Sequence, residues 1–332
     1  MDDFIVLCNG LVEVTLCKIG ASIYDIKTPD KNGFKDSILV TTNHLDEFAK
    51  ANSYFGKTIG RTGGRISNSK FILDGIEYKI QSDDPNGLHG GIDSLSYKKF
   101  DYEIEITNDY KSVIFKYRSP DMESGYPGNC DINVRYNLYI NENKLEVIYE
   151  AKTDKKTILN LANHAYFNLS GSISENIVEH HLYINSSKME RIENLIPTEI
   201  IDTPKIYSFK EPHQIKDYLF SEEIINNTNG YDYPYIFDNV GIDFNNIVLT
   251  HNKSGRRMTI NTSYPVVVVY TCNYTEDIEV NNGKKLKPYD AVCLECMYHP
   301  NTINSDFLEN KKDILNPEDK YYEKVVYSFD TI

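Results

Sequence analysis

The chain has 332 residues, of which 40% are hydrophobic and 25% are charged, a composition typical of folded proteins and not of disordered ones. Its formal net charge of −14 has the wrong sign for neutralising nucleic-acid phosphates or anionic lipids, which excludes both as partners. The sequence has no run of about 18 apolar residues, and Met1–Phe4 is acidic where a signal peptide is basic. We therefore expect a cytoplasmic protein with a small-molecule partner.

Short segments rich in Val, Ile, Tyr, Phe and Thr recur along the chain and are separated by Asn, Asp and Gly, as in proteins built from many strands. Asp74-Gly75 separates two such segments and predicts a tight hairpin, which implies antiparallel pairing. Helical periodicity is confined to 45–51 and 214–226. The clearest predicted strands are 11–17, 98–107, 112–118, 131–140 and 144–153.

The organisation of the chain favours one domain, although its length alone would suggest two. No Pro/Gly/Ser-rich linker, break in composition or fixed-period repeat divides residues 1–332. Polar segments such as 170–176 and 275–288 are expected to be surface loops. The predicted fold class is all-β, a large antiparallel β-sandwich with few short helices.

Two glycine-rich segments precede the middle of the chain. Gly60–Arg65 lacks the lysine and the strand-to-helix context of a phosphate-binding loop, so phosphate binding there is not expected. Gly87–Gly91 surrounds His89 with glycines, which allow the backbone to approach a ligand closely. The alternative is that His89 is a turn residue bonded to the backbone.

Residues 157–169 alternate in a way that predicts a strand with one polar face. Asn160, His164, Tyr166 and Asn168 fall on that face, where convergent hydrogen-bonding groups would suit a polyhydroxyl ligand. The alternative is a solvated strand face with a surface histidine.

Residues 291–297 form an apolar segment that contains one carboxylate, Glu295. Burial of an unpaired carboxylate is costly, so Glu295 either forms a structural ion pair or is tuned as a general base. The run Val266–Tyr270 predicts a buried strand that could lie beside it.

The six cysteines lie mostly in apolar segments and are expected to be reduced core thiols. Cys293 and Cys296 have the spacing of half a zinc site, but the sequence has no second such pair, and residues three apart on a strand point to opposite faces. We therefore expect no metal.

Several segments, in order along most of the chain, resemble the galactose mutarotase (aldose 1-epimerase) family. Each motif alone is weak, whereas their shared order is specific, and the Asn-His-x-Tyr-Phe-Asn-Leu motif is the strongest. The matching segments are Gly60-Arg61, Arg65-Ile66, Leu88–Gly91, Gly125–Gly128, Asn160–Leu169, Leu195–Thr198, Gly230–Asp232, Tyr270-Thr271 with Asn273, and Leu294-Glu295 with Pro300 and Asn304.

This resemblance implies a galactose mutarotase-like supersandwich with a monosaccharide in an open cleft. It also implies that Glu295 is the general base at the C1 hydroxyl and His164 the general acid at the ring oxygen. His89 would assist at the ring oxygen. By the same analogy, Arg65 and Asp232 would hold sugar hydroxyls and Tyr270 would line the cleft.

The implied reaction accounts for these residue types. Opening a cyclic hemiacetal requires removal of the C1 hydroxyl proton and protonation of the ring oxygen O5. A carboxylate and an imidazolium suit this task and can exchange roles when the ring closes. Rotation about C1–C2 before closure gives the opposite anomer, so no cofactor is expected.

The chain departs from the family pattern at three positions, which leaves its sugar preference open. Gly64 replaces the usual Asn before Arg65, Tyr233 replaces a frequent His after Asp232, and Met297 replaces a Gln near the base. The leading interpretation is an aldose 1-epimerase that acts on galactose, glucose or a related free hexose, as a monomer or homodimer.

Three other functions remain to be weighed against this interpretation. A hexose-6-phosphate mutarotase of similar fold would need additional cations in the cleft, and the net charge of −14 argues against it. A non-catalytic sugar-binding protein would not need both His164 and Glu295. A glycosidase would need two flanking carboxylates, and only Asp232 is available as the second one.

Overall fold

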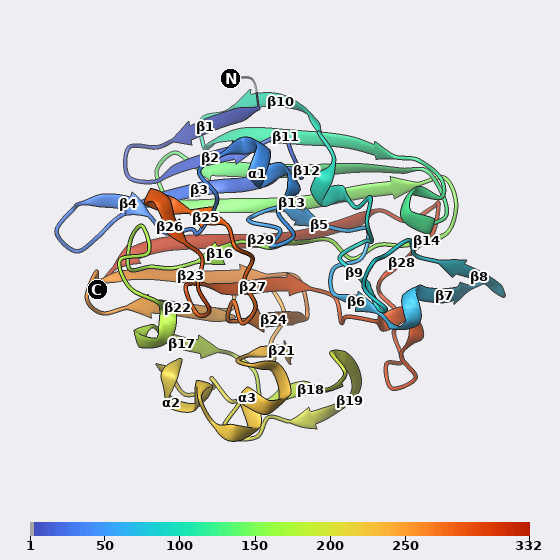
Figure 1. Ribbon diagram of the computed structural model, residues 1–332. Helices are drawn as coiled ribbons and strands as arrows, with labels where there is room; N and C mark the ends of the chain where they lie inside the picture. Colours follow the sequence, from blue (N-terminus) through green and yellow to red (C-terminus); the bar gives the residue numbers. More distant parts are fainter. Residues whose placement is uncertain (1–2) are drawn as a thin grey trace.

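The computed structural model describes residues 3–332 and is dominated by antiparallel sheets (Figure 1). The largest sheet has nine strands, in the order β10 (Asp101–Ile106), β11 (Tyr110–Ser119), β12 (Cys130–Tyr139), β13 (Lys144–Thr153), β29 (Tyr321–Thr331), β23 (Arg256–Thr262), β22 (Ile247–His251), β17 (His181–Ile184) and β20 (His213–Gln214). Every neighbouring pair in it is antiparallel.

Two smaller sheets pack against the large one. One has six strands, in the order β16 (Tyr166–Phe167), β27 (Val292–Met297), β24 (Val266–Tyr270), β21 (Asp232–Ile236), β18 (Lys188–Glu193) and β19 (Ile196–Asp202). The other has four strands, in the order β1 (Phe4–Cys8), β2 (Glu13–Cys17), β3 (Ser22–Pro29) and β4 (Lys35–Ser37).

Short two-stranded ribbons, three short α-helices and six 3₁₀ helices of three residues each complete the described part of the chain. The ribbons pair β5 (Thr58–Ile59) with β15 (Ala162–Asn163), β6 (Arg65–Ile66) with β9 (Gly87–Leu88), β7 (Lys70–Leu73) with β8 (Ile76–Lys79), β14 (Thr157–Ile158) with β28 (Ile314–Leu315), and β25 (Glu279–Val280) with β26 (Lys284–Lys285). The α-helices are α1 (Leu45–Lys50), α2 (Lys216–Leu219) and α3 (Glu222–Thr228).

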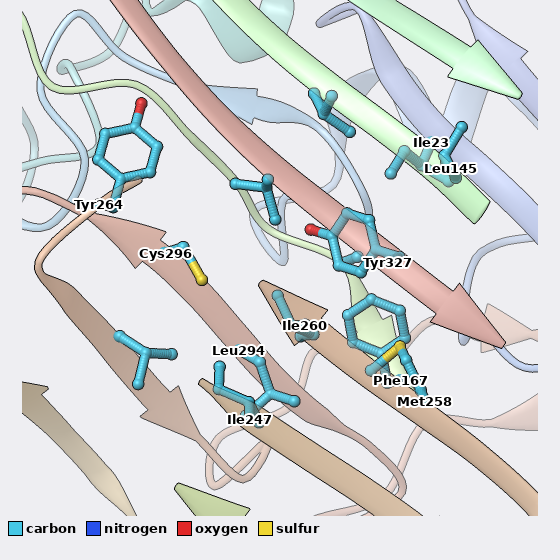
Figure 2. Packing of buried hydrophobic residues seen from close by; sticks show 14 of the residues in the cluster. Ile23, Leu145, Phe167, Ile247, Met258, Ile260, Tyr264, Leu294, Cys296 and Tyr327 are labelled. Atoms are coloured by element: carbon cyan, nitrogen blue, oxygen red, sulfur yellow. The ribbon is translucent and has the colours of Figure 1, made fainter. Parts of the chain in front are cut away.

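The main hydrophobic core lies between the large sheet and the two smaller ones. Alternate side chains of β27, Leu294 and Cys296, point into it and face residues of β22 and β23 such as Ile247 and Ile260 (Figure 2). The same core includes Val14 of the four-stranded sheet. This packing of sheet on sheet confirms the predicted antiparallel sandwich.

Most predicted elements are found. The five strands predicted before residue 153 correspond to β2, β10, β11, β12 and β13, and α1 matches the first predicted helix. The hairpin at Asp74-Gly75 is present, and both residues have positive φ, as a two-residue hairpin turn requires. The second predicted helix is two short helices, α2 and α3. None of the described helices is long and apolar enough to cross a membrane.

The prediction of one continuous strand over 157–169 is wrong. The segment forms three two-residue strands, β14, β15 and β16, and each pairs with a different partner strand. The whole segment is buried, so it has no solvated face. Its alternation reflects side chains that point toward different parts of the interior.

Candidate active site

One cavity, with a volume of about 340 Å³, lies where β21, β24 and β27 meet the segment around His164 and the loops at 52–65 and 88–89. This volume is in the range of small-ligand sites. Its lining includes all six residues singled out in the sequence: Arg65, His89, His164, Asp232, Tyr270 and Glu295. Residues up to 230 positions apart in the sequence therefore meet at one site.

Strand β27 places Glu295 at this cavity through simple alternation. Glu295 and Met297 line the cavity, whereas Leu294 and Cys296 point to the opposite side, into the core (Figure 2). Glu295 is 3% exposed and lies opposite Val268 on the adjacent β24. The apolar strand predicted around a single carboxylate is therefore present, and it holds the carboxylate rigidly.

His164 lies between β15 and β16 and is fixed by its backbone. The amide of Gly56 donates to the His164 carbonyl at 2.9 Å, and the His164 amide donates to the Lys57 carbonyl at 3.0 Å. The residue is 5% exposed, and Nε2 of its side chain lies 3.4 Å from Oε1 of Glu295. The second oxygen, Oε2 of Glu295, is buried without a hydrogen-bonding partner. The pair is thus close, while half of the carboxylate is free to bond a ligand.

His89 enters the cavity from the turn after β9. Its amide donates to the Gly64 carbonyl at 2.9 Å, and the Gly64 amide donates to Nδ1 of His89 at 3.2 Å. Because Nδ1 accepts this bond, a neutral His89 carries its ring proton on Nε2. The ring centroids of His89 and His164 are 5.2 Å apart, and the rings are nearly perpendicular. His89 therefore offers a fixed hydrogen-bond donor beside His164.

Burial shifts the pKa values of both His164 and Glu295. Desolvation lowers the pKa of His164 to about 4, so its resting form at neutral pH is the neutral imidazole. Desolvation, reinforced by nearby Asp232, raises the pKa of Glu295 well above its usual value, and Arg65 opposes the shift. A proton shared by the pair therefore rests on Glu295 and not on His164.

The remaining predicted residues surround this pair. Burial raises the pKa of Asp232 to about 6, against the opposing effect of Arg65. Nε of Arg65 lies 3.6 Å from Oδ2 of Asp84. The hydroxyl of Tyr270 donates to the carbonyl of Tyr274 at 3.1 Å, so it is the ring of Tyr270 that lines the cavity.

Two asparagines expected at the site have structural roles instead. Asn160 exchanges two hydrogen bonds with the backbone of Tyr298, at 3.1 and 2.9 Å. Asn168 donates to the carbonyls of Glu175 and Asp290. Neither asparagine lines the cavity, because these bonds turn both amides toward the backbone of neighbouring loops.

Several cavity residues were not predicted from the sequence, among them Tyr54 and Glu276. Tyr54 packs edge-on against His89, with ring centroids 4.9 Å apart. The carboxylate of Glu276 accepts hydrogen bonds from the backbone amides of Asn52 and Ser53 and thereby holds that rim in place. Glu276 belongs to the predicted surface loop 275–288 and also lines the cavity.

Two of the three departures from the family pattern lie at the cavity. Gly64 and Met297 line it, and a Cβ at Gly64 would lie 2.8 Å from Cβ of Pro300. A side chain at position 64 therefore requires Pro300 to move. Tyr233 does not line the cavity: it packs against Tyr207 and accepts a hydrogen bond from Thr228. This departure does not contact the site.

The side chains of His89, His164 and Glu295 are close enough together to bind a metal ion, with ligand atoms within 4.8 Å of one another. A histidine that ligates a metal normally donates its other ring N–H to an acceptor. Nδ1 of His89 instead faces a donor, the Gly64 amide. This hydrogen bond puts the proton on the nitrogen that would have to bind the metal, so the site is poorly suited to one.

Comparisons with known proteins give a consistent result. A family model described as aldose 1-epimerase matches residues 3–328. The chain is 28% identical to galactose mutarotase of Homo sapiens, over 97% of this chain and 92% of that protein. It is also 28% identical to aldose 1-epimerase of Haemophilus influenzae, over 97% and 93% of the two chains.

Solved structures agree with these matches. A GalM/aldose epimerase homologue from C. elegans superposes with a TM-score of 0.89 at 28% identity, over 99% of both chains. Galactose 1-epimerase from Lactobacillus acidophilus has the same fold, with a TM-score of 0.86 at 24% identity, over 99% of this chain and 94% of the other.

Proposed function

The chain belongs to the aldose 1-epimerase family, and from this membership we propose that it interconverts the α and β anomers of a free hexose such as galactose or glucose. The observation that carries the proposal is the pairing of His164 with the cavity residue Glu295 at 3.4 Å, with Oε2 of Glu295 buried and without a hydrogen-bonding partner. This arrangement supplies two proton-transfer groups and leaves one carboxylate oxygen for the sugar.

Ring opening begins with the ionised form of the pair. The resting proton moves from Glu295 to Nε2 of His164, which gives a carboxylate beside an imidazolium. Glu295 then removes the proton of the C1 hydroxyl while His164 protonates O5, and the C1–O5 bond breaks to leave an aldehyde. The raised pKa of Glu295 makes its carboxylate a stronger base for this step.

Ring closure uses the product state of the pair. Opening leaves the proton on Glu295 and none on Nε2 of His164, which is the resting arrangement. After rotation about C1–C2, His164 removes the proton from the C5 hydroxyl and Glu295 protonates the new C1 oxygen. Each protonation state of the pair therefore serves one half of the cycle, and no proton has to be exchanged with solvent.

The other cavity residues bind and orient the sugar in this proposal. Nε2–H of His89, directed by its bond from Gly64, assists His164 at the ring oxygen. Arg65 and Asp232 hold sugar hydroxyls, and the ring of Tyr270 packs against the apolar side of the sugar.

The composition of the cavity favours a free sugar over a sugar phosphate. Among the described residues that line it, Arg65 is the sole Lys or Arg, and it faces three carboxylates, those of Asp232, Glu276 and Glu295. A phosphate group would meet net negative charge in this site. A non-catalytic sugar-binding protein would have no use for a proton-transfer pair, and a glycosidase would pair two carboxylates instead.

Polarimetry of freshly dissolved α-D-galactose, α-D-glucose and α-D-glucose 6-phosphate tests the proposal. The wild type should accelerate mutarotation of at least one free hexose, and Glu295→Gln should lose most of that rate. Glu146→Gln is a matched control, because Glu146 is also buried but lies on β13 and pairs with Lys324. A wild type no faster than the spontaneous reaction on every free hexose would refute the proposal.

The remaining expectations are part of the same proposal. We infer that residues 1–332 form one domain, since the main core includes residues from Ile5 to Phe329. A cytoplasmic location fits the six free cysteines. The protein would act as a monomer or homodimer on a small sugar, without a nucleic-acid or membrane partner.

A further inference from the structure

The thiol of Cys293 lies directly behind the catalytic imidazole. Cys293 and Glu295 are two residues apart on β27 and therefore point to the same side of the strand. Sγ of Cys293 lies 3.6 Å from Nδ1 of His164, and Oε1 of Glu295 lies 3.4 Å from Nε2. One strand thus contacts both nitrogens of the ring, through a thiol and a carboxylate.

The surroundings of Cys293 fix the position of its sulfur. The side chain is fully buried, and Cys293 lies opposite Tyr166 in the antiparallel pairing of β16 with β27. The sulfur therefore lies beside His164 in a place where solvent does not compete.

We propose that Cys293 is a positioning residue of the epimerase reaction: its sulfur accepts the Nδ1–H of His164 and so reserves Nε2 as the nitrogen that exchanges protons with Glu295 and the sugar. The inference rests on the proposed function. It assigns Cys293 no contact with the sugar and no covalent step.

The requirements of the cycle favour this tautomer. Nε2 must lack a proton in the resting state, where Glu295 holds the exchangeable one, so a neutral His164 must carry its proton on Nδ1. The sulfur of Cys293, 3.6 Å from Nδ1, is placed to accept that proton.

A thiol at this position also has a different electrostatic effect from a carboxylate. A carboxylate beside Nδ1 would stabilise the imidazolium and hold the proton on His164. Burial raises the pKa of the Cys293 thiol well above its usual value, so the group stays neutral. A neutral acceptor orients the ring without fixing the proton on it, which leaves the proton free to return to Glu295.

Kinetics of three variants test the inference. Cys293→Ala should lower kcat about three- to tenfold, the equivalent of one neutral hydrogen bond, with KM unchanged. Cys293→Ser, which keeps an acceptor, should recover most of the loss. Cys296→Ala is the matched control: its thiol is also buried on β27 but points to the opposite side, into the core, and kcat should be unchanged (Figure 2).

Nitrogen chemical shifts of ¹⁵N-labelled histidine give a readout that a packing role would not move. In the sugar-free wild type at neutral pH, His164 should show a protonated Nδ1 and a bare Nε2, and in Cys293→Ala the ring should become a mixture of tautomers. A wild-type ring protonated on Nε2 alone, or wild-type kcat in Cys293→Ala, would overturn the inference. Because the spectra need no activity, they remain informative if the proposed function fails.

Discussion

Of the three histidine–glutamate pairs among residues 3–332, two differ clearly in how completely their hydrogen bonds are used. In the first, Nε2 of His251 lies 2.7 Å from Glu175, Nδ1 lies 3.0 Å from Ser254, and Lys253 bonds the second oxygen of Glu175. In the second, Nε2 of His164 lies 3.4 Å from Glu295, whose other oxygen has no partner.

This difference explains why one histidine–glutamate pair is structural and the other is reactive. Glu175 overcomes its desolvation through hydrogen bonds from Lys253 and His251, which lower its pKa. Glu295 lacks such bonds, and desolvation raises its pKa. A saturated pair stabilises the fold, whereas an unsaturated pair on a cavity keeps bonding capacity for a substrate.

The largest expected effect is a difference in kcat between variants of His164 and of His251. His164→Gln should lower kcat about 10²- to 10⁴-fold, the usual contribution of a general acid–base group, with little loss of stability. His251→Gln should leave kcat unchanged and lower the free energy of unfolding by about 1–3 kcal/mol, because it breaks a bonded network. Polarimetry measures kcat and denaturant unfolding measures stability for both variants. The difference between the two pairs would be refuted if both variants changed kcat and stability by similar amounts.

The pH dependence of the reaction should reflect the cavity residue Asp232. Protonation of this carboxylate, whose pKa burial raises to about 6, removes the charge that holds a sugar hydroxyl and so reduces the population of competent enzyme as pH falls. The profile of kcat/KM should therefore decline from neutral pH toward pH 5, above the range where ordinary carboxylates titrate. A profile that stays flat down to pH 5 would contradict the sugar-binding role of Asp232.

The two glutamates should also have opposite effects on stability as pH changes. The raised pKa of Glu295 means that the folded state binds more protons than the unfolded state, so its contribution to stability declines as pH rises above about 4.5. The lowered pKa of Glu175 gives a contribution that is present at neutral pH and is lost on acidification.

Unfolding free energies at pH 5 and pH 7.5 measure this contrast. Relative to wild type, Glu295→Gln should gain stability on going from pH 5 to pH 7.5. Glu175→Gln should keep a constant difference from wild type over this range, because the contribution of Glu175 is lost only as pH falls below about 4.5. Parallel behaviour of the two variants would show that the environments of the carboxylates are alike.

The smallest expected effect is that of chelation. Because Gly64 donates to Nδ1 of His89, we expect no metal between His89, His164 and Glu295. Extensive treatment with EDTA should leave the polarimetric rate unchanged. A lost rate that Zn²⁺ restores would show that the site takes a metal after all.

Particular residues show how far sequence alone leads. The sandwich was predictable because its strands are long and alternate, and Glu295 was found as the one carboxylate in an apolar strand. Alternation along β27 also places Cys293 on the side of Glu295, although its contact with His164 depends on a partner 129 residues away.

Tyr54 and Glu276 lie in loops, whose spatial partners no periodicity specifies. Asn160 and Asn168 were misassigned because their segment is buried on every side.

The measurement that tests the central claim most directly is a double-mutant cycle on Glu295 and His164. If the two groups pass one proton between them, losing either should stop the exchange. Polarimetric kcat values for Glu295→Gln, His164→Gln and the double variant should then show a double variant no slower than the slower single variant. Losses that multiply would instead show that the two residues act independently.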